Sequence, residues 1–208
     1  MSLLTNWGYT LTGIDTLPDM LTVNEFDEFT AGKYSGDART GKNISAASTA
    51  IRNYCGWHVY PSLPCTLNTT LHDRHIAWVR GDLLIQLPAA YVTEVSSVKI
   101  GGVEHSTFVI EPNGLLKVYE AHAAGMKEYT AVEVTYTAGI PDALMDSIEE
   151  LIAHRVIHAL ASSAGVQSET AGGVSITYSA NWINSARSTA LADDNKEVLA
   201  PYKVKGVF

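Results

Sequence analysis

The stretch Val132-Glu-Val-Thr-Tyr-Thr-Ala-Gly-Ile-Pro-Asp-Ala-Leu144 contains a change from strand to helix that decides the fold class. Val132, Val134 and Tyr136 alternate with polar residues, which is typical of a strand with one buried face. The Gly-Ile-Pro that follows interrupts this alternation, and apolar residues then recur at helical spacing. The stretch therefore predicts a block of β-structure followed by the longest helix of the chain, at about residues 142–164.

Short strands are expected upstream of this point, because apolar residues recur with a period of two from about residue 66. The segment Leu83–Leu87 ends at a proline. Two further segments, Val95–Ile100 and Phe108–Ile110, lead into turn sequences, Gly-Gly at 101–102 and Pro-Asn-Gly at 112–114. Short strands joined by tight turns predict a small antiparallel sheet.

A short helix is expected to begin at Thr22. Glu25 follows it by three residues, and this spacing forms a capping box in which each side chain accepts a hydrogen bond from the other residue's backbone N–H. The expected apolar stripe of this helix consists of Val23, Phe26 and Phe29.

A second helix is expected to begin near Asn43 or Ser45 and to end at Gly56, which suits the left-handed position after a helix. Its apolar positions are Ala47, Ala50, Ile51 and Tyr54. In the long helix that starts near residue 142, the expected core-facing residues are Leu144, Ile148, Leu151, Ile152 and Ala159.

The C-terminal segment is rich in Ser, Thr, Ala and Gly. Val174, Ile176 and Tyr178 alternate as in a strand, and residues 193–199 have the composition of a short helix. The segment has too few apolar residues to form a core of its own, so we expect it to dock on the domain or to order against a partner.

These patterns predict the α+β class. We expect a small helical core, with two main antiparallel helices plus a short N-terminal helix, an inserted small antiparallel β-sheet domain and an extended C-terminal arm. The expected bounds within the single chain 1–208 are 18–65 for the N-terminal helices, 66–138 for the β insertion, 139–165 for the long core helix and 166–208 for the arm.

Composition excludes several classes of protein. The net charge is −8, with 14 basic and 22 acidic residues, which argues against a protein that grips nucleic acid through a basic face. The apolar runs are too short for a membrane span. The N-terminus lacks the basic-then-apolar order of a signal peptide, and we expect a protein made in the cytoplasm.

Two pairs of histidines are candidates for metal binding. His154 and His158 are four residues apart on the predicted long helix, and this spacing places two ligands on one helix face. Arg155 stands where zinc hydrolases of this pattern carry a catalytic glutamate, so we interpret the pair as boundary residues, with Glu150 beside His154. His72 and His75 form the second pair, in a polar loop.

Other reactive residues have structural interpretations. Asp146, Glu149 and Glu150 fall in the first turns of the long helix, where the helix dipole favours acids. Cys55 and Cys65 are expected to be buried small hydrophobic residues rather than a disulfide. No glycine-rich phosphate loop and no catalytic Cys–His spacing is present. We therefore predict no catalytic residue, no metal and no cofactor.

The order of these segments resembles the head–tail connector proteins of tailed bacteriophages, also called head-completion or adaptor proteins. The resemblance extends over roughly residues 20–205. The segments that carry it are Ala46–Pro61, Leu83–Pro88, Val92–Gly102, Pro112-Asn-Gly-Leu115, Val132–Gly139, Ile140-Pro-Asp-Ala-Leu144, Glu169–Tyr178 and Leu199-Ala-Pro-Tyr-Lys203.

The resemblance implies a structural protein of the virion neck, assembled in the host cytoplasm. It implies a ring of about twelve copies on the portal vertex of the filled head. This ring would extend the DNA channel without binding DNA specifically and would present a surface to the next neck or tail-completion protein. It implies no catalytic residue and no membrane partner. Within the arm, we nominate Val174, Ile176, Tyr178 and Trp182 as contacts to a partner protein.

Two other functions stay open. One is a small metal-dependent hydrolase that uses His154, His158 and either His72 or His75. The other is a monomeric binding module of a phage or bacterium.

Overall fold

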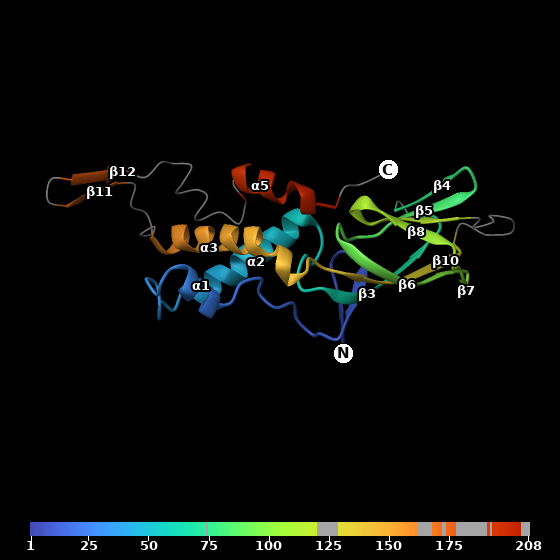
Figure 1. The fold of residues 1–208 in the computed structure, drawn as a ribbon, viewed down its shortest axis with the longest axis horizontal. Helices are drawn as coiled ribbons and strands as arrows, with labels where there is room; N and C mark the ends of the chain where they lie inside the picture. Colours follow the sequence, from blue (N-terminus) through green and yellow to red (C-terminus); the bar gives the residue numbers. More distant parts are fainter. Residues whose placement is uncertain are drawn as a thin grey trace. The chain divides into compact units, whose positions relative to one another are not determined.

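The chain forms two compact units, a sheet unit and a helical unit (Figure 1). The computed structural model describes residues 1–73, 75–119, 129–161, 168–171, 174–177, 191 and 193–204. The sheet unit comprises Met1–Pro18, Cys55–Asp142 and Tyr202–Phe208. The helical unit comprises Asp19–Tyr54 and Ala143–Pro201. Helices and antiparallel sheets are both present, as the predicted α+β class requires.

The larger sheet of the sheet unit has six strands in the order β1-β2-β3-β10-β6-β7, paired antiparallel. The strand bounds are β1 Ser2–Leu4, β2 Tyr9–Thr12, β3 Leu63–Thr70, β6 Val92–Ile100, β7 Val103–Glu104 and β10 Ala131–Ala138. β10 lies between β3 and β6, and its Val132, Val134 and Tyr136 side chains are buried. The alternation in the sequence therefore predicted this strand and its buried face correctly.

A second sheet in the same unit has four antiparallel strands in the order β4-β5-β9-β8. The bounds are β4 Ile76–Val79, β5 Asp82–Gln86, β8 Phe108–Glu111 and β9 Leu115–Val118. Its core consists of pairs such as Leu83 with Val118 and Ile85 with Leu116, and all four side chains are fully buried. The two predicted hairpins, at residues 101–102 and 112–114, are confirmed as the β6–β7 and β8–β9 connections.

The N-terminal strands β1 and β2 are absent from the sequence prediction, which began its first element at Thr22. β2 pairs with β3, and its Tyr9 and Leu11 side chains are almost completely buried. These four residues offer too short an alternation to predict a strand. β2 therefore depends on pairing with residues far along the chain.

Gly139 explains the break after β10. Its φ angle is +141°, and a Cβ atom at this position would lie 2.3 Å from the Cα atom of Ser62. No other residue fits here without moving the neighbouring backbone, because Cβ atoms do not approach backbone atoms so closely. Glycine thus allows β10 to end tightly against the chain that enters β3.

A buried hydrogen-bond network joins three segments of the sheet unit. The Tyr9 hydroxyl accepts a hydrogen bond from the backbone N–H of His58 at 3.0 Å and lies 2.8 Å from the Nδ1 atom of the same residue. The His58 Nε2 atom is 2.9 Å from the carbonyl oxygen of Ala138. Because a carbonyl only accepts, Nε2 carries the proton, and Nδ1 accepts from the Tyr9 hydroxyl. The network joins β2, the chain that leaves the second helix, and the end of β10.

The helical unit contains α1 (Val23–Phe29), most of α2 (Thr40–Cys55) and α3 (Asp146–Ala161). The capping box of α1 is confirmed. The Thr22 N–H donates to the Glu25 carboxylate at 2.6 Å, and the Glu25 N–H donates to the Thr22 hydroxyl at 3.2 Å. The predicted apolar stripe is only partly correct, since Phe26 is buried whereas Val23 and Phe29 are about half exposed.

The longer helices differ from the prediction at their ends. α2 begins at Thr40, before the expected start, and Gly56 follows it with the expected left-handed φ of +79°. α3 begins at Asp146 after a short 3₁₀ turn, so Leu144 lies outside it and is exposed. The buried face of α3 consists of Ile148, Leu151, Ile152, Ala153, Val156 and Leu160, and Ala159 is half-buried.

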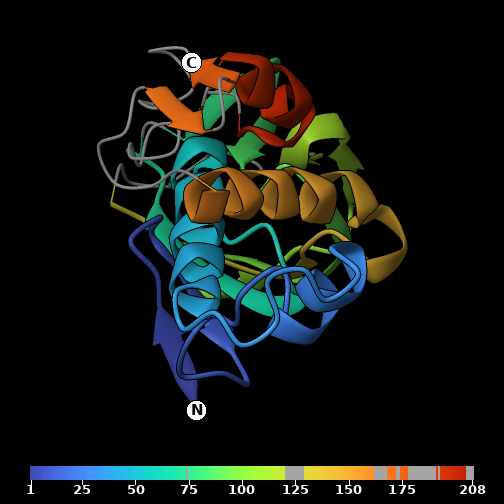
Figure 2. The same cartoon turned by 90° about the vertical axis from the view of Figure 1, so that its left-hand side faces the viewer.

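When each helix is followed from its N-terminus, α2 and α3 run in opposite directions in Figure 1, and the two helices cross each other in Figure 2. Among the described residues, no helix has the length and apolar character needed to cross a bilayer. The expected end of α3, at residues 162–164, lies outside the described residues.

The Tyr9–His58 hydrogen bond provides a test of the sheet unit. We expect Tyr9→Phe to lower the free energy of unfolding by about 1–3 kcal/mol, because it leaves the buried Nδ1 atom and N–H group of His58 without this partner. Urea unfolding measures the change. The control is Tyr129→Phe, which removes the hydroxyl of a side chain that is 77% exposed and should change the free energy by less than about 0.5 kcal/mol. Equal effects of the two substitutions would contradict the assigned role of the network.

Candidate functional site

The C-terminal segment that the sequence nominated as a partner contact contains a β-hairpin. β11 (Ser168–Ala171) pairs antiparallel with β12 (Val174–Thr177), so that Val174 lies opposite Ala171 and Ile176 opposite Glu169. The strand predicted from the alternation at 174 and 176 is therefore confirmed over Val174–Thr177. The other two nominated residues, Tyr178 and Trp182, lie outside the described residues.

The hairpin forms a two-stranded sheet of its own. In the part of the chain that the structure describes, β11 and β12 pair only with each other. An isolated hairpin of two strands is marginally stable in water, because it buries little surface and leaves both outer edges unpaired. Such edges are able to accept a strand from another chain.

The chain that follows the hairpin is docked rather than extended. α5 (Asp193–Leu199) packs near α3, and its Leu199 side chain is fully buried. The Tyr54 hydroxyl donates a hydrogen bond to the Lys196 carbonyl at 3.2 Å. The short helix predicted at 193–199 is confirmed, whereas the expectation of an extended arm over 166–208 is wrong for residues 193–204.

Further hydrogen bonds hold the end of this segment within the sheet unit. The indole N–H of Trp57 donates to the Tyr202 carbonyl at 2.7 Å, and the Val204 N–H donates to the Cys55 carbonyl at 3.0 Å. Residues 162–192 therefore join two anchored segments, the end of α3 and the start of α5. The hairpin belongs to this connection and not to a free tail.

A hollow of about 310 Å³ lies between α1 and α3 in the helical unit. Leu21, which is almost completely buried, and the half-exposed ring of Phe29 supply its apolar surface. Its other lining residues are four acids: Glu25, Asp146, Glu149 and Glu150. We call this hollow the acidic groove.

The sequence predicts that the acids of α3 interact favourably with the helix dipole and that Glu25 caps α1, and both predictions agree with the positions of these residues. The acidic groove could not be predicted, because no local pattern indicates that α1 and the first turns of α3 lie together. Phe29, which the periodicity predicted in the core, lines this groove and is therefore half-exposed.

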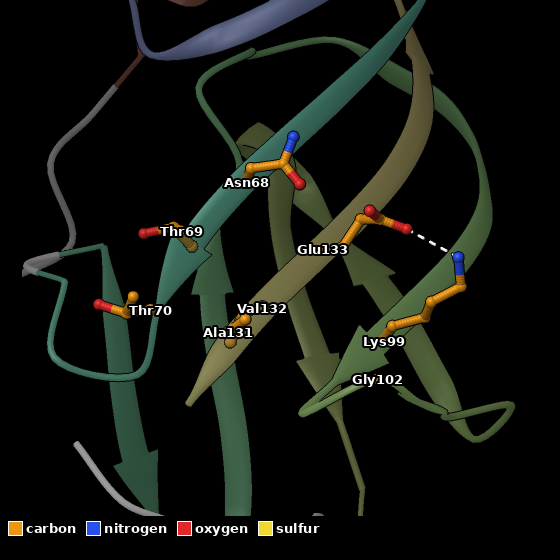
Figure 3. Close-up of a pocket in the computed structure, with 8 residues that line it drawn as sticks. All are labelled: Asn68, Thr69, Thr70, Lys99, Gly102, Ala131, Val132 and Glu133. Carbon is orange, nitrogen blue, oxygen red and sulfur yellow. Dashed lines mark hydrogen bonds and ion pairs between the residues drawn. The ribbon is translucent and has the colours of Figure 1, made fainter. Parts of the chain in front are cut away.

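A second hollow, of about 390 Å³, lies on the six-stranded sheet. It is lined by Asn68–Thr70 of β3, Ala131–Glu133 of β10, Lys99 of β6 and Gly102. Figure 3 shows Lys99 and Glu133 pointing toward each other, with 2.7 Å between the ammonium and carboxylate groups. The ion pair joins the two charged side chains that line this hollow, and its other polar side chains are the uncharged Asn68, Thr69 and Thr70.

The candidate metal ligands fall into two pairs, one in each unit. His154 and His158 are both exposed on α3, where the Nε2 atom of His154 lies 3.6 Å from the Glu150 carboxylate and its ring packs edge-on against Phe29. This agrees with their interpretation as boundary residues. His72 and His75 belong to the other unit. Within the described residues, no cluster of three or more His, Cys, Asp or Glu residues is suited to hold a metal ion.

The two cysteines are buried and free, as predicted. Burial raises the pKa of the Cys55 thiol to about 12, although the charge of Lys203 acts in the opposite direction. Burial likewise raises the pKa of the Cys65 thiol to about 12. Neither thiol is a nucleophile near neutral pH, because the thiolate is the reactive form.

Because the two thiols are buried, the free energy of unfolding depends on pH in the alkaline range. An unfolded thiol ionises near pH 9.0, whereas the folded ones stay protonated until about pH 12. The folded state thus binds more protons in this window, so we expect the free energy of unfolding to fall as the pH rises from 9.0 towards 12. Urea unfolding at several pH values measures this slope, which should be shallower in a Cys55→Ala/Cys65→Ala variant. A variant slope equal to that of the wild type would contradict it.

Comparison with known proteins identifies the family. The family model described as "Head completion protein" matches residues 19–189. The match begins after β2, ends before α5 and includes α1, α2, α3 and the hairpin. No curated protein sequence matches the chain. Because the family match spans most of the chain, the protein belongs to the head completion protein family, a family of structural proteins of the phage head–tail region.

Proposed function

We propose that the protein is a head–tail connector that forms a ring on the portal vertex, extends the DNA channel and provides the docking surface for the next neck or tail protein. The observation that carries this proposal is the family match over residues 19–189. The role is structural and not enzymatic. The ring contains about twelve copies, each presenting two different patches to its neighbours.

Charge supports a channel through which DNA slides. The net charge of −8 gives a ring of such subunits a negative field, which repels the phosphate backbone. DNA therefore passes without adhering to the wall. The protein acts in the virion neck, after assembly in the host cytoplasm.

Each segment of the chain has a separate role in the proposed ring. We propose that the helices within 18–65 and 139–165 form the core of the ring, and that the β insertion at 66–138 faces outward or toward the tail. The segment 166–208 carries the contact to the partner protein, with Val174, Ile176, Tyr178 and Trp182 as its contact residues. The separate two-stranded sheet of β11 and β12 supports this assignment, because a hairpin of this kind gains stability when another surface covers it.

Co-sedimentation with the portal ring encoded in the same genome tests the proposal. We expect the full chain to sediment with the portal in about one-to-one subunit ratio. We expect Val174→Asp/Ile176→Asp to abolish this, because positions 174 and 176 share one face of β12 and a buried charge at an interface is strongly unfavourable.

The matched control is Ser175→Asp, which places the same charge on the opposite face of β12 and should leave the binding intact. The thermal unfolding midpoint of each variant shows whether the fold persists. A wild-type chain that stays at the top of the gradient as a monomer contradicts the connector function. Binding that is equally strong in all variants contradicts the hairpin contact alone.

A further inference from the structure

The first strand, β1, forms one edge of the six-stranded sheet (dark blue in Figure 2). The Met1 carbonyl accepts a hydrogen bond from the Gly13 N–H at 3.1 Å, and the Thr5 N–H donates to the Tyr9 carbonyl at 2.9 Å. In an antiparallel pair, every second residue bonds the neighbouring strand, and the residues between them direct their N–H and C=O groups the other way. The odd-numbered residues of β1 therefore face β2.

The even-numbered residues, Ser2 and Leu4, direct their backbone groups away from the sheet. Among the described residues, β1 pairs only with β2. Both residues are exposed, and the Leu4 side chain is 75% exposed. We call the N–H and C=O groups of Ser2 and Leu4 the open edge, because a further strand is able to bond them.

The sequence around the open edge lacks the usual guards against strand pairing. Residues 1–14, which contain β1 and β2, have no charged side chain and no proline. Charges, prolines and bulges are the common devices that keep exposed edges apart. The opposite edge of the same sheet has such a guard, because the Glu104 carboxylate of β7 accepts a hydrogen bond from the Val98 N–H at 3.2 Å.

The open edge is complementary to itself. When two β1 strands lie antiparallel with Leu3 opposite Leu3, Ser2 of each strand lies opposite Leu4 of the other. These are the residues whose backbone groups point outward, so each Ser2–Leu4 pair exchanges both of its hydrogen bonds. Every group of the open edge then has a partner.

We propose that β1 of one copy pairs antiparallel with β1 of a second copy, with Leu3 on the two-fold axis. The contact joins the two six-stranded sheets into one continuous sheet. It is isologous and closes at two copies, whereas neighbours in a ring meet through two different patches. The inference therefore goes beyond the connector function and does not depend on it.

Side chains support a second β1 as the occupant. Leu3 lies opposite Leu11, which is fully buried, so the two Leu3 side chains meet on the core side of the joined sheet. On the other face, Ser2 of the second copy lies beside the exposed Leu4. No side-chain charge is brought into the contact, because β1 contains none. Pairing therefore covers apolar surface without like-charge repulsion.

Disulfide formation tests the register. In Leu3→Cys, the new cysteine faces its own copy across the axis at about 4.5 Å between Cα atoms, which suits a disulfide. In Leu4→Cys, the two cysteines lie diagonally at about 7–8 Å, which does not. Random collision favours the opposite order, because Leu4 is exposed and Leu3 is half-buried. We expect Leu3→Cys to form the intermolecular disulfide several-fold faster, as measured on non-reducing gels. The native cysteines are buried in both variants.

Sedimentation velocity over about a hundredfold range of concentration measures the association itself. We expect the wild-type chain to shift toward a dimer at high concentration. Leu4→Lys should lose the shift, because two ammonium groups then share one face of the contact. Leu4→Pro should also lose it, because it removes an outward N–H while sparing the bonds to β2. The matched control is Val103→Lys, which places the same charge on the opposite edge, at a side chain that is 63% exposed, and should associate like the wild type.

Several results would overturn the pairing. A wild-type chain that stays monomeric over the whole range is one, and equally fast cross-linking of the two cysteine variants is another. Association that persists in Leu4→Lys and Leu4→Pro, with both folded by circular dichroism, also contradicts it. If the Leu4 amide of a monomeric chain is protected from hydrogen exchange only in the portal complex, a strand of another protein occupies the open edge instead.

Discussion

The hydrogen bonds of His58 are the constraint on which the sheet unit depends. The Nδ1 atom and the backbone N–H of His58 form hydrogen bonds with the Tyr9 hydroxyl of β2, and its Nε2 atom donates to the carbonyl at the end of β10. One buried residue therefore connects the N-terminal strands, the chain that leaves α2 and the central strand of the larger sheet. The adjacent Trp57 binds the returning C-terminus at Tyr202. A hydrogen bond lost there leaves buried polar atoms unsatisfied, which costs more than the bond itself contributes.

This anchoring distinguishes the docked scaffold from the hairpin, which we propose as the contact surface. The returning segment 193–204 is docked by the buried Leu199 side chain and by hydrogen bonds to the Lys196 carbonyl and from the Val204 N–H, which anchor the C-terminal end of the connection that contains β11 and β12. The hairpin stands in a separate sheet, and among the described residues its two strands pair only with each other. Segments with few buried contacts open most easily and are suited to order against a partner. A connector needs both properties, because it must keep its fold and still adapt to the proteins above and below it.

Local signals account for the part of the fold that was predictable from the sequence. The Thr22–Glu25 capping box, the alternation of Val132, Val134 and Tyr136 and the turns at 101–102 and 112–114 each depend on residues a few positions apart, and each is confirmed. Strands β1 and β2 were missed because β1 pairs with β2, and β2 depends on pairing with β3, far along the chain. The acidic groove was missed for the same reason, since it requires α1 to meet α3. Phe29 has the spacing of a core residue, but its position at the groove between α1 and α3 leaves it half-exposed, and this position depends on tertiary packing.

We propose that this head completion protein acts as a ring between the portal and the tail. A cryo-electron microscopy reconstruction of the neck of the mature virion tests it most directly, because it locates each chain without assuming a partner. We expect a closed ring of this chain around the DNA channel, directly against the portal, with the β11–β12 hairpin in contact with another protein. A neck that lacks this chain, or one that holds it as single copies away from the channel, would rule out the proposed function.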